Sequence, residues 1–361
     1  MLDCSHRNGS VSPSRTALHL TLFIPDLLPP DERYLAGGGP AAPALQRLLG
    51  RGDVQRFPAI DAEPWLCQTF EVEQRGDWPV AALTAAVDGL DTGNDWWLRA
   101  DPVHLQMQRS STRVLAAPAL TLSNIEADAL AASLNTHFSA DGIAITAAHP
   151  TRWYIRQQES AAVAGPTLSA AAGRPLPRMA GGGAHASHWH RVLTEAQMVL
   201  HEHPVNAARE ARGLPVVNSL LLWGGGRKPA VPGRRFSAVW TDDALAVALA
   251  EQSDADCAAV PANAASWLAR KPDADGRHLI TLDRAHHAAR YGEPNDWAKA
   301  VSMLDEFWIA PLWAALNGRT LAELVIVITG PAQCLRCTLR SADKLKFWKR
   351  ALPWPAIAGN Y

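Results

Sequence analysis

One stretch constrains the fold more than any other part of this sequence: residues 200–226, LHEHPVNAAREARGLPVVNSLLLWGGG. Pro204 suits the first turn of a helix, Gly213 suits its end, and Pro215 prevents the helix from resuming. A short apolar run then leads to Trp223 and three glycines. Such a run is typical of a strand buried on both faces of a parallel sheet, so the stretch predicts an α/β protein.

The rest of the chain alternates short apolar runs with helical segments, which is the pattern of an α/β fold. Strands are predicted over residues 18–24, 237–240, 278–282 and 324–329, and the longer helices over 78–90, 242–251 and 296–316. We expect four strands to lie in one mostly parallel central sheet with helices on both of its faces. These four strands end at Asp26, Trp223, Leu282 and Thr329.

Polar residues occur near the ends of the predicted helix and strand, where a simple core would not require them. They are Asn206, Arg209, Asn218 and Arg227. They could cap the helix and shape the turn. They could instead form a polar binding site at the end of a sheet. Both interpretations are consistent with the residue types.

The order His-Pro-Val-Asn, arginine, Gly-Leu-Pro-x-x-Asn, apolar strand and glycine loop, starting at His203, resembles a known signature. It is that of the archaeal-type cofactor-independent phosphoglycerate mutases, which belong to the alkaline phosphatase superfamily. Those mutases usually continue with Arg-Gly-Ala-Gly, whereas here Trp223 precedes three glycines. This tryptophan form and the segment LTLFIPDLLPP at residues 20–30 look more like a bacterial offshoot, described as regulators of pathogenicity factors.

The resemblance implies an alkaline-phosphatase-like central sheet that carries a smaller inserted α+β lobe. We assign residues 16–95 and 187–361 to the α/β domain and residues 96–157 to the inserted lobe. Residues 158–186 are rich in Ala, Gly and Pro and are expected to form a linker. Residues 1–15 are polar and are expected to be disordered.

The resemblance also implies two divalent metals that clamp a transferred phosphoryl group, and a Ser or Thr that accepts it. Asp26 follows the first strand, and Asp283 and His287 follow a later apolar strand. These three residues match positions that hold metal in the superfamily. They are the candidate residual ligands for one divalent metal, Mn or Zn.

Other positions of the implied metal site do not match. Pro331 and Ala332 stand where an Asp-His pair is expected, and Arg340 stands where a further histidine is expected. Proline and alanine cannot coordinate a metal, and no convincing serine nucleophile occurs between residues 53 and 96. A normal two-metal site is therefore not expected.

Arginine forks suit phosphate and carboxylate groups, so arginines near the implied site are candidates for binding a phosphorylated or carboxylated small molecule. In the inserted lobe, the resemblance implies that Arg99 and His104 face substrate. The candidate ligand-binding residues are Arg99, His104, Asn206, Arg209, Asn218 and Arg227.

These observations favour a catalytically degenerate phosphoglycerate-mutase-like protein with a binding or regulatory role. One alternative is an active metal-dependent phosphomutase, which interconverts 2- and 3-phosphoglycerate, or a phosphatase with rearranged metal ligands. Another is a protein-interaction scaffold that uses the tryptophan-containing C-terminal segment.

Composition excludes several function classes. The 34 basic and 35 acidic residues give a net charge of −1, which argues against a nucleic-acid-binding footprint. No apolar run approaches the roughly 20 residues that span a bilayer. The first 15 residues contain no apolar signal core. We therefore expect a cytoplasmic protein without nucleic-acid or membrane partners.

The cysteines and histidines form no recognisable site. An odd count of five scattered cysteines argues against a disulfide framework. Cys334 and Cys337 form a lone Cys-x-x-Cys without a second pair, which favours two ordinary thiols over a redox or zinc site. The histidines between His185 and His203 are dense, but their spacing matches no standard zinc pattern, which favours surface and capping roles.

Overall fold

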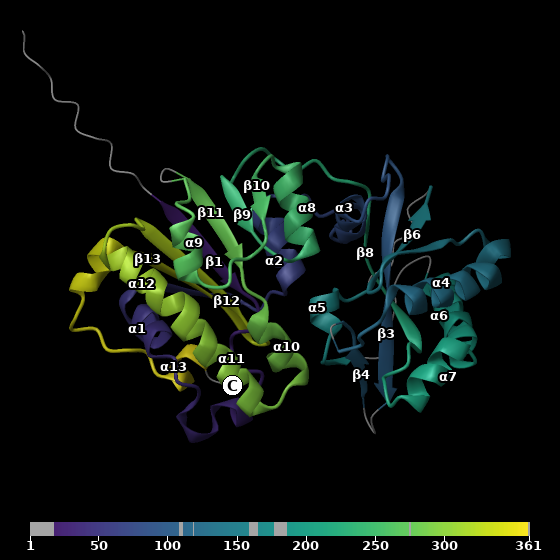
Figure 1. Cartoon of the computed structure of the whole chain (residues 1–361), viewed down its shortest axis with the longest axis horizontal. Helices are drawn as coiled ribbons and strands as arrows, with labels where there is room; N and C mark the ends of the chain where they lie inside the picture. Colours follow the sequence, from purple (N-terminus) through teal and green to yellow (C-terminus); the bar gives the residue numbers. More distant parts are fainter. Residues whose placement is uncertain are drawn as a thin grey trace, which may run out of the picture.

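The computed structural model describes residues 18–107, 111–117, 119–158, 165–176, 186–273 and 276–359. Two lobes lie side by side, and each is built around its own β-sheet (Figure 1). None of the helices within these ranges has the length and apolar character needed to cross a membrane. The segment predicted to be disordered, residues 1–15, lies outside the described residues.

The larger lobe contains a seven-stranded sheet in the order β10-β9-β11-β1-β12-β13-β2. Its strands are β1 (His19–Ile24), β2 (Asp53–Pro58), β9 (Ala238–Trp240), β10 (Asp256–Ala258), β11 (Arg277–Thr281), β12 (Glu323–Thr329) and β13 (Gln333–Arg340). Neighbours from β10 to β12 pair in parallel, and β13 pairs antiparallel with both β12 and β2. Of these seven strands only β13 runs against the others, which confirms the predicted α/β fold with a mostly parallel central sheet.

Side chains of β1 alternate between two apolar cores, one on each face of the sheet. Leu20 and Leu22 enter one core, and Phe23 enters the other. The first face is covered by α1 (Pro43–Arg51), α9 (Ala264–Ala269), α10 (Arg284–Tyr291), α11 (Pro294–Leu304), α12 (Ala310–Asn317) and α13 (Trp354–Ala358), and the second by α2 (Ala62–Thr69), α3 (Val80–Val87) and α8 (Ala244–Gln252). Burial on both faces explains why these strands are almost continuous apolar runs.

The long helix predicted over residues 296–316 is present, but its middle is irregular. A π-helical turn, η3 (Asp305–Ile309), separates α11 from α12. Asp305 lies in this turn, and its carboxylate accepts hydrogen bonds from the N–H groups of Ala44 (3.1 Å) and Leu45 (2.6 Å). The π turn therefore lets one long helix cap the N-terminus of α1.

The smaller lobe contains a second sheet in the order β5-β6-β3-β4-β7, and β8 pairs with β3 outside this path. Its strands are β3 (Trp96–Met107), β4 (Thr112–Leu115), β5 (Ile145–His149), β6 (Arg152–Gln157), β7 (Pro175–Leu176) and β8 (Ser219–Gly226). Helices α4 (Asn124–Phe138), α6 (Ala186–His201) and α7 (Pro204–Ala211) pack on this lobe, and the short α5 (Leu168–Ala171) precedes β7.

The strand predicted to end at Trp223 does not lie in the central sheet, so the prediction of four strands in one sheet is wrong for this strand. It is β8, and it pairs antiparallel with β3 in the smaller lobe. Its apolar run is buried on both faces, but between two different cores. Leu222 packs with α4 and α6, whereas Leu221 joins the core that contains α2 and α8. Burial on both faces therefore does not specify which sheet a strand enters.

The second sheet draws on residues from both sides of the predicted linker, 158–186. Helices α6 and α7 and strand β8 follow that segment, and α5 and β7 lie within it. We therefore propose that the smaller lobe extends beyond residue 157, as far as the end of β8.

Candidate functional site

Asp26 lies just beyond β1, at the C-terminal edge of the central sheet. Its backbone is left-handed (φ 53°), which is uncommon for a residue other than glycine. Its N–H donates to Oγ1 of Thr329 at the end of β12 (3.0 Å). This turn fixes the carboxylate where the carboxyl ends of two parallel strands meet, which is the usual place for ligand sites in open α/β sheets.

Helix α10 brings two partners to this carboxylate, because His286 and Arg290 are one helical turn apart. Oδ2 of Asp26 accepts hydrogen bonds from His286 Nδ1 (2.6 Å) and Arg290 Nε (2.8 Å). Oδ1 accepts from Arg290 Nη2 (2.9 Å). Both carboxylate oxygens are therefore occupied by charge-assisted hydrogen bonds.

The local electrostatics keep Asp26 ionised. Burial alone would raise the pKa of this carboxyl group, because the side chain is only slightly exposed. The hydrogen bond from His286 and the positive charge of Arg290 outweigh burial, and they hold the pKa of Asp26 below its ordinary value of 3.8.

A second guanidinium and a second carboxylate complete the cluster. Arg174 follows α5, and its Nη1 lies 3.1 Å from Asp61 Oδ1, while its Nη2 lies 3.7 Å from Asp26 Oδ1. Nη2 of Arg290 lies 3.7 Å from the same oxygen of Asp61. Burial and the neighbouring charge of Arg290 lower the pKa of Arg174. Four separate segments of the chain thus place two guanidiniums against two carboxylates.

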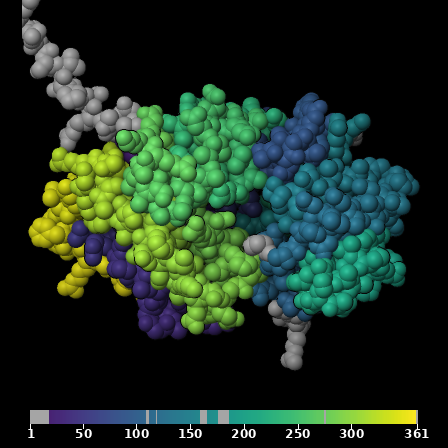
Figure 2. All heavy atoms as spheres, viewed as in Figure 1, coloured from purple at the N-terminus to yellow at the C-terminus, as the bar shows by residue number. Residues whose placement is uncertain are grey.

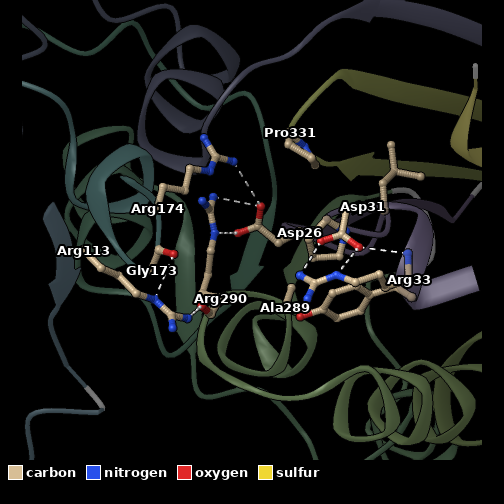
Figure 3. Close-up of a pocket in the computed structure, with 12 residues that line it drawn as sticks. Asp26, Asp31, Arg33, Arg113, Gly173, Arg174, Ala289, Arg290 and Pro331 are labelled. Carbon is tan, nitrogen blue, oxygen red and sulfur yellow. Dashed lines mark hydrogen bonds and ion pairs between the residues drawn. The ribbon is translucent and has the colours of Figure 1, made fainter. Parts of the chain in front are cut away.

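A cavity of about 570 Å³ borders this cluster. Its charged lining residues, drawn in Figure 3, are Asp26, Asp31, Arg33, Arg113, Arg174 and Arg290. Four arginines against two aspartates give the lining a formal charge of +2. The cavity therefore favours an anionic occupant.

The arginines of the cavity differ in how much of their hydrogen-bonding capacity is used. Arg33 pairs with Asp31, and Arg113 donates to the backbone carbonyls of Gly173 (3.3 Å) and Arg290 (2.7 Å). Nη1 of Arg290 is buried and has no hydrogen-bond partner among the described residues. A buried donor without a partner is costly, and this nitrogen is too buried to be reached from the cavity.

The residues present do not fit the divalent metal that the resemblance implies. The part of the chain that the structure describes contains no cluster of three His, Cys, Asp or Glu side chains able to hold a metal. Asp283, the N-cap residue of α10, and His287 within α10 are both exposed, and the ring centroids of His287 and Tyr291 lie 5.4 Å apart. Asp283 and His287 therefore do not converge on Asp26. Pro331, which stands in the sequence where the Asp-His pair was expected, lines the cavity (Figure 3).

Two of the candidate ligand-binding residues in α7, Asn206 and Arg209, are buried and hold the backbone together. Nδ2 of Asn206 donates to the carbonyls of Leu200 and Val217 (both 2.7 Å), and its Oδ1 accepts from the Val217 N–H (2.9 Å). Arg209 is fully buried, and it donates to three backbone carbonyls and to Glu126. The capping and turn interpretation therefore describes these residues.

Asn218 and His104 have the same kind of role. The Asn218 amide forms two hydrogen bonds with the backbone of Leu105, at 2.7 and 3.0 Å, as a neighbouring strand would. His104 Nδ1 donates to the carbonyl of Val216 (2.9 Å). Both side chains join β3 to the chain that leads into β8.

The remaining two candidates lie away from the cavity lining. Arg99 is buried, it pairs with Asp101 through Nε (2.9 Å) and Nη2 (2.8 Å), and it lies over the ring of Trp223. Arg227 is exposed and donates to the carbonyls of Asn94 and Gln158. None of the six candidates therefore contributes to the Asp26 cluster.

Cys334, Cys337 and His203, three of the residues singled out in the sequence, have structural roles. Cys334 and Cys337 lie on β13, and they enter cores on opposite faces of the central sheet. Burial raises the pKa of Cys334 to about 11, so the thiol stays protonated. His203 caps α7 by accepting from the Val205 N–H (3.1 Å), while His185 lies outside the described residues.

Comparison with known proteins shows the fold alone. No family model and no curated protein matches the chain. The structure is similar to that of the PH0037 protein from Pyrococcus horikoshii (TM-score 0.53, 17% identity, covering 95% of this chain and 92% of that one). It is also similar, at a TM-score of 0.45 and 17% identity, to the cofactor-independent phosphoglycerate mutase from Thermoplasma acidophilum, covering 89% of each chain.

Proposed function

We propose that this protein is a phosphoglycerate-mutase-like binding protein that has lost metal-dependent phosphoryl transfer. Its cavity beside Asp26 would bind a small molecule that carries a phosphate or carboxylate group. The observation that carries the proposal is the occupation of both Asp26 oxygens by Arg290 and His286.

The charge of the cluster opposes a divalent cation. A metal at Asp26 would have to displace the bidentate Arg290 and would add two positive charges beside Arg174. The guanidinium of Arg290 already supplies the positive charge that a metal would provide. This replacement does not depend on metal supply.

The same arginines suit an anionic ligand. Arg113, Arg174 and Arg290 line the cavity. Guanidinium groups bind phosphate and carboxylate oxygens in pairs, which fixes both position and orientation. A cavity of about 570 Å³ is within the range of small-molecule sites.

A regulatory role for this binding, like that of the pathogenicity-factor regulators, is supported by the sequence resemblance around His203 and Trp223. An active metal-dependent phosphomutase or phosphatase is the main alternative. It would require ligands to rearrange around Asp26.

The test combines calorimetry with an assay of mutase activity. Titration with 3-phosphoglycerate and with inorganic phosphate is expected to show binding, and a coupled assay supplied with Mn, Mg or Zn is expected to show no turnover. Arg174→Ala should weaken binding at least about tenfold, the equivalent of one lost charge-assisted hydrogen bond.

Arg227→Ala is the matched control, because Arg227 is an exposed arginine outside this cavity, and its binding should equal that of the wild type. Metal-dependent turnover that Asp26→Ala abolishes would refute the proposal. Equal loss of binding in both arginine variants would place the ligand elsewhere.

A further inference from the structure

The loop that follows β13 exposes three large apolar side chains. Leu345, Phe347 and Trp348 are 63%, 78% and 68% exposed. The rings of Phe347 and Trp348 pack edge to face, with their centroids 5.3 Å apart. This C-terminal segment is yellow in Figures 1 and 2, and it lies at the end of the molecule farthest from the smaller lobe. Adjacent exposed apolar groups of this size mark an interaction surface.

Both ends of this loop are fixed to the larger lobe. At its start, η4 (Ser341–Leu345) is held by a hydrogen bond from the Arg340 N–H to the carboxylate of Asp343 (2.7 Å). At its end, the Leu352 N–H donates to the carbonyl of Gln46 in α1 (2.8 Å). The three apolar side chains therefore project from an anchored base.

The loop is also basic, although the whole chain has a net charge of −1. Residues 340–350 contain five Lys or Arg residues and one acidic residue, Asp343. Asp343 pairs with Lys346 (2.6 Å), whereas Lys349 and Arg350 are exposed and form no salt bridge with the described residues. Positive charge is thus concentrated around the apolar tip.

The loop and the Asp26 cavity lie at opposite ends of the strands of the central sheet. Arg340, where the loop begins, pairs with Glu323 at the start of β12, whereas Asp26 bonds to Thr329 at the end of the same strand. A strand of this length separates the two edges by about 20 Å. A partner at the loop would leave the cavity open.

We propose that this loop is a peripheral membrane anchor for anionic lipid surfaces, with Phe347 and Trp348 entering the headgroup region and Lys349 and Arg350 contacting lipid phosphates. Aromatic side chains beside Lys and Arg are the combination that stabilises proteins at the membrane interface. Each basic residue near an anionic surface strengthens binding about fivefold. No helix among the described residues could span a membrane. The proposed anchor lies at the membrane surface and needs no spanning helix.

The size of the apolar tip favours lipid over a protein partner. A stable protein interface needs about 800 Å² of buried surface on each partner. Three side chains that each bury about 200 Å² supply less than this area. A lipid surface requires no complementary protein shape, and it matches both the apolar tip and its basic flanks.

The test is vesicle flotation with the full chain, using phosphatidylcholine vesicles with or without phosphatidylserine. We expect flotation only with the anionic vesicles, and binding should weaken as salt rises toward about 1 M, where charges are screened within about 3 Å. The double variant F347A/W348A should weaken binding at least about tenfold. K349E/R350E removes two basic charges, so it should weaken binding at least about 25-fold.

Ile125→Ala and Lys299→Glu are the matched controls, since they change an exposed apolar and an exposed basic residue outside the loop. Both controls should float like the wild type. Absence of flotation with anionic vesicles, or equal flotation of the loop variants, would overturn the proposal. So would a wild-type dimer in sedimentation analysis that F347A/W348A dissociates, because the loop would then be a protein interface. Because every substituted residue is exposed, loss of folding is not expected, and circular dichroism checks it.

Discussion

The α7–β8 segment of the smaller lobe and the Asp26 cluster of the larger lobe use polar side chains in opposite ways. In the first, Asn206 and Arg209 are buried, and they donate mainly to backbone carbonyls, some within residues 200–217 and two, Leu120 and Thr121, in the loop before α4. In the second, Asp26 and Arg290 meet other side chains at the border of a cavity. The recognisable signature therefore builds the fold, while the unrecognised cluster has the features of a site.

The difference follows from how each region is assembled. A helix, turn and strand in direct succession must satisfy their own buried backbone groups, so polar residues at fixed spacing are selected for that task. A site at a sheet edge collects side chains from separate segments, and its unused donors face a ligand or solvent. A contiguous polar motif is thus weak support for ligand binding.

The largest predicted effect is on the α7–β8 segment. Arg209→Met should lower the free energy of unfolding by about 3–5 kcal/mol, because it leaves three backbone carbonyls without their donor. Urea denaturation measures the loss. Arg227→Met is the control, since Arg227 is exposed, and its effect should stay within about 0.5 kcal/mol. Equal small losses in both variants would mean that the signature arginine is not structural.

At the cavity we expect a smaller loss of stability than for Arg209→Met, together with weaker ligand binding. Arg290→Met should lower the free energy of unfolding by about 1–3 kcal/mol, since Asp26 keeps His286 and the more distant Arg174 as partners. Binding of inorganic phosphate should fall at least about tenfold. Calorimetry on the folded variant measures it. If the phosphate affinity were unchanged, the Asp26 cluster would not be a phosphate-binding site, and its functional contrast with the α7–β8 segment would be lost.

The contribution of Asp26 to stability should depend on pH. The pKa of Asp26 is lowered in the folded protein, so its stabilising contribution is complete above the ordinary value of 3.8. It is lost as the pH falls through the lower folded value. Asp26→Asn should therefore be less stable than the wild type at neutral pH, and the two should converge at the acid end. Urea midpoints across this range measure the effect, and a constant difference at every pH would contradict it.

Much of the fold could be predicted because local patterns specify it. The apolar runs of β1, β11 and β12 were evident from the residues alone. The sheet that β8 joins could not be predicted, since Leu221 and Leu222 are buried alike in either arrangement. Only the packing of distant segments decides between the two sheets.

The site was predicted only at Asp26, which the end of an apolar strand indicates. Asp61 and Arg174 carry no local pattern, and Arg174 lies in the segment expected to be a linker. His286 and Arg290 were missed for a different reason. The Asp-x-x-x-His spacing directs attention to His287, whereas the turn of α10 presents the preceding residue to Asp26.

The smallest effect is therefore expected at the residues that the spacing selected. Asp283→Asn combined with His287→Gln should change the free energy of unfolding by no more than about 0.5 kcal/mol, because both side chains are exposed and neither contacts Asp26. Phosphate affinity should equal that of the wild type, in contrast to Arg290→Met. Calorimetric titration with Mn and Zn provides the decisive measurement. If the wild type binds one ion tightly and this double variant does not, then α10 must rotate to bring these residues to Asp26. The pairing of Arg290 with Asp26 would in that case be one of two states of the cluster. The Asp26 cluster would then be a metal site, and its contrast with the structural α7–β8 segment would no longer rest on a metal-free site.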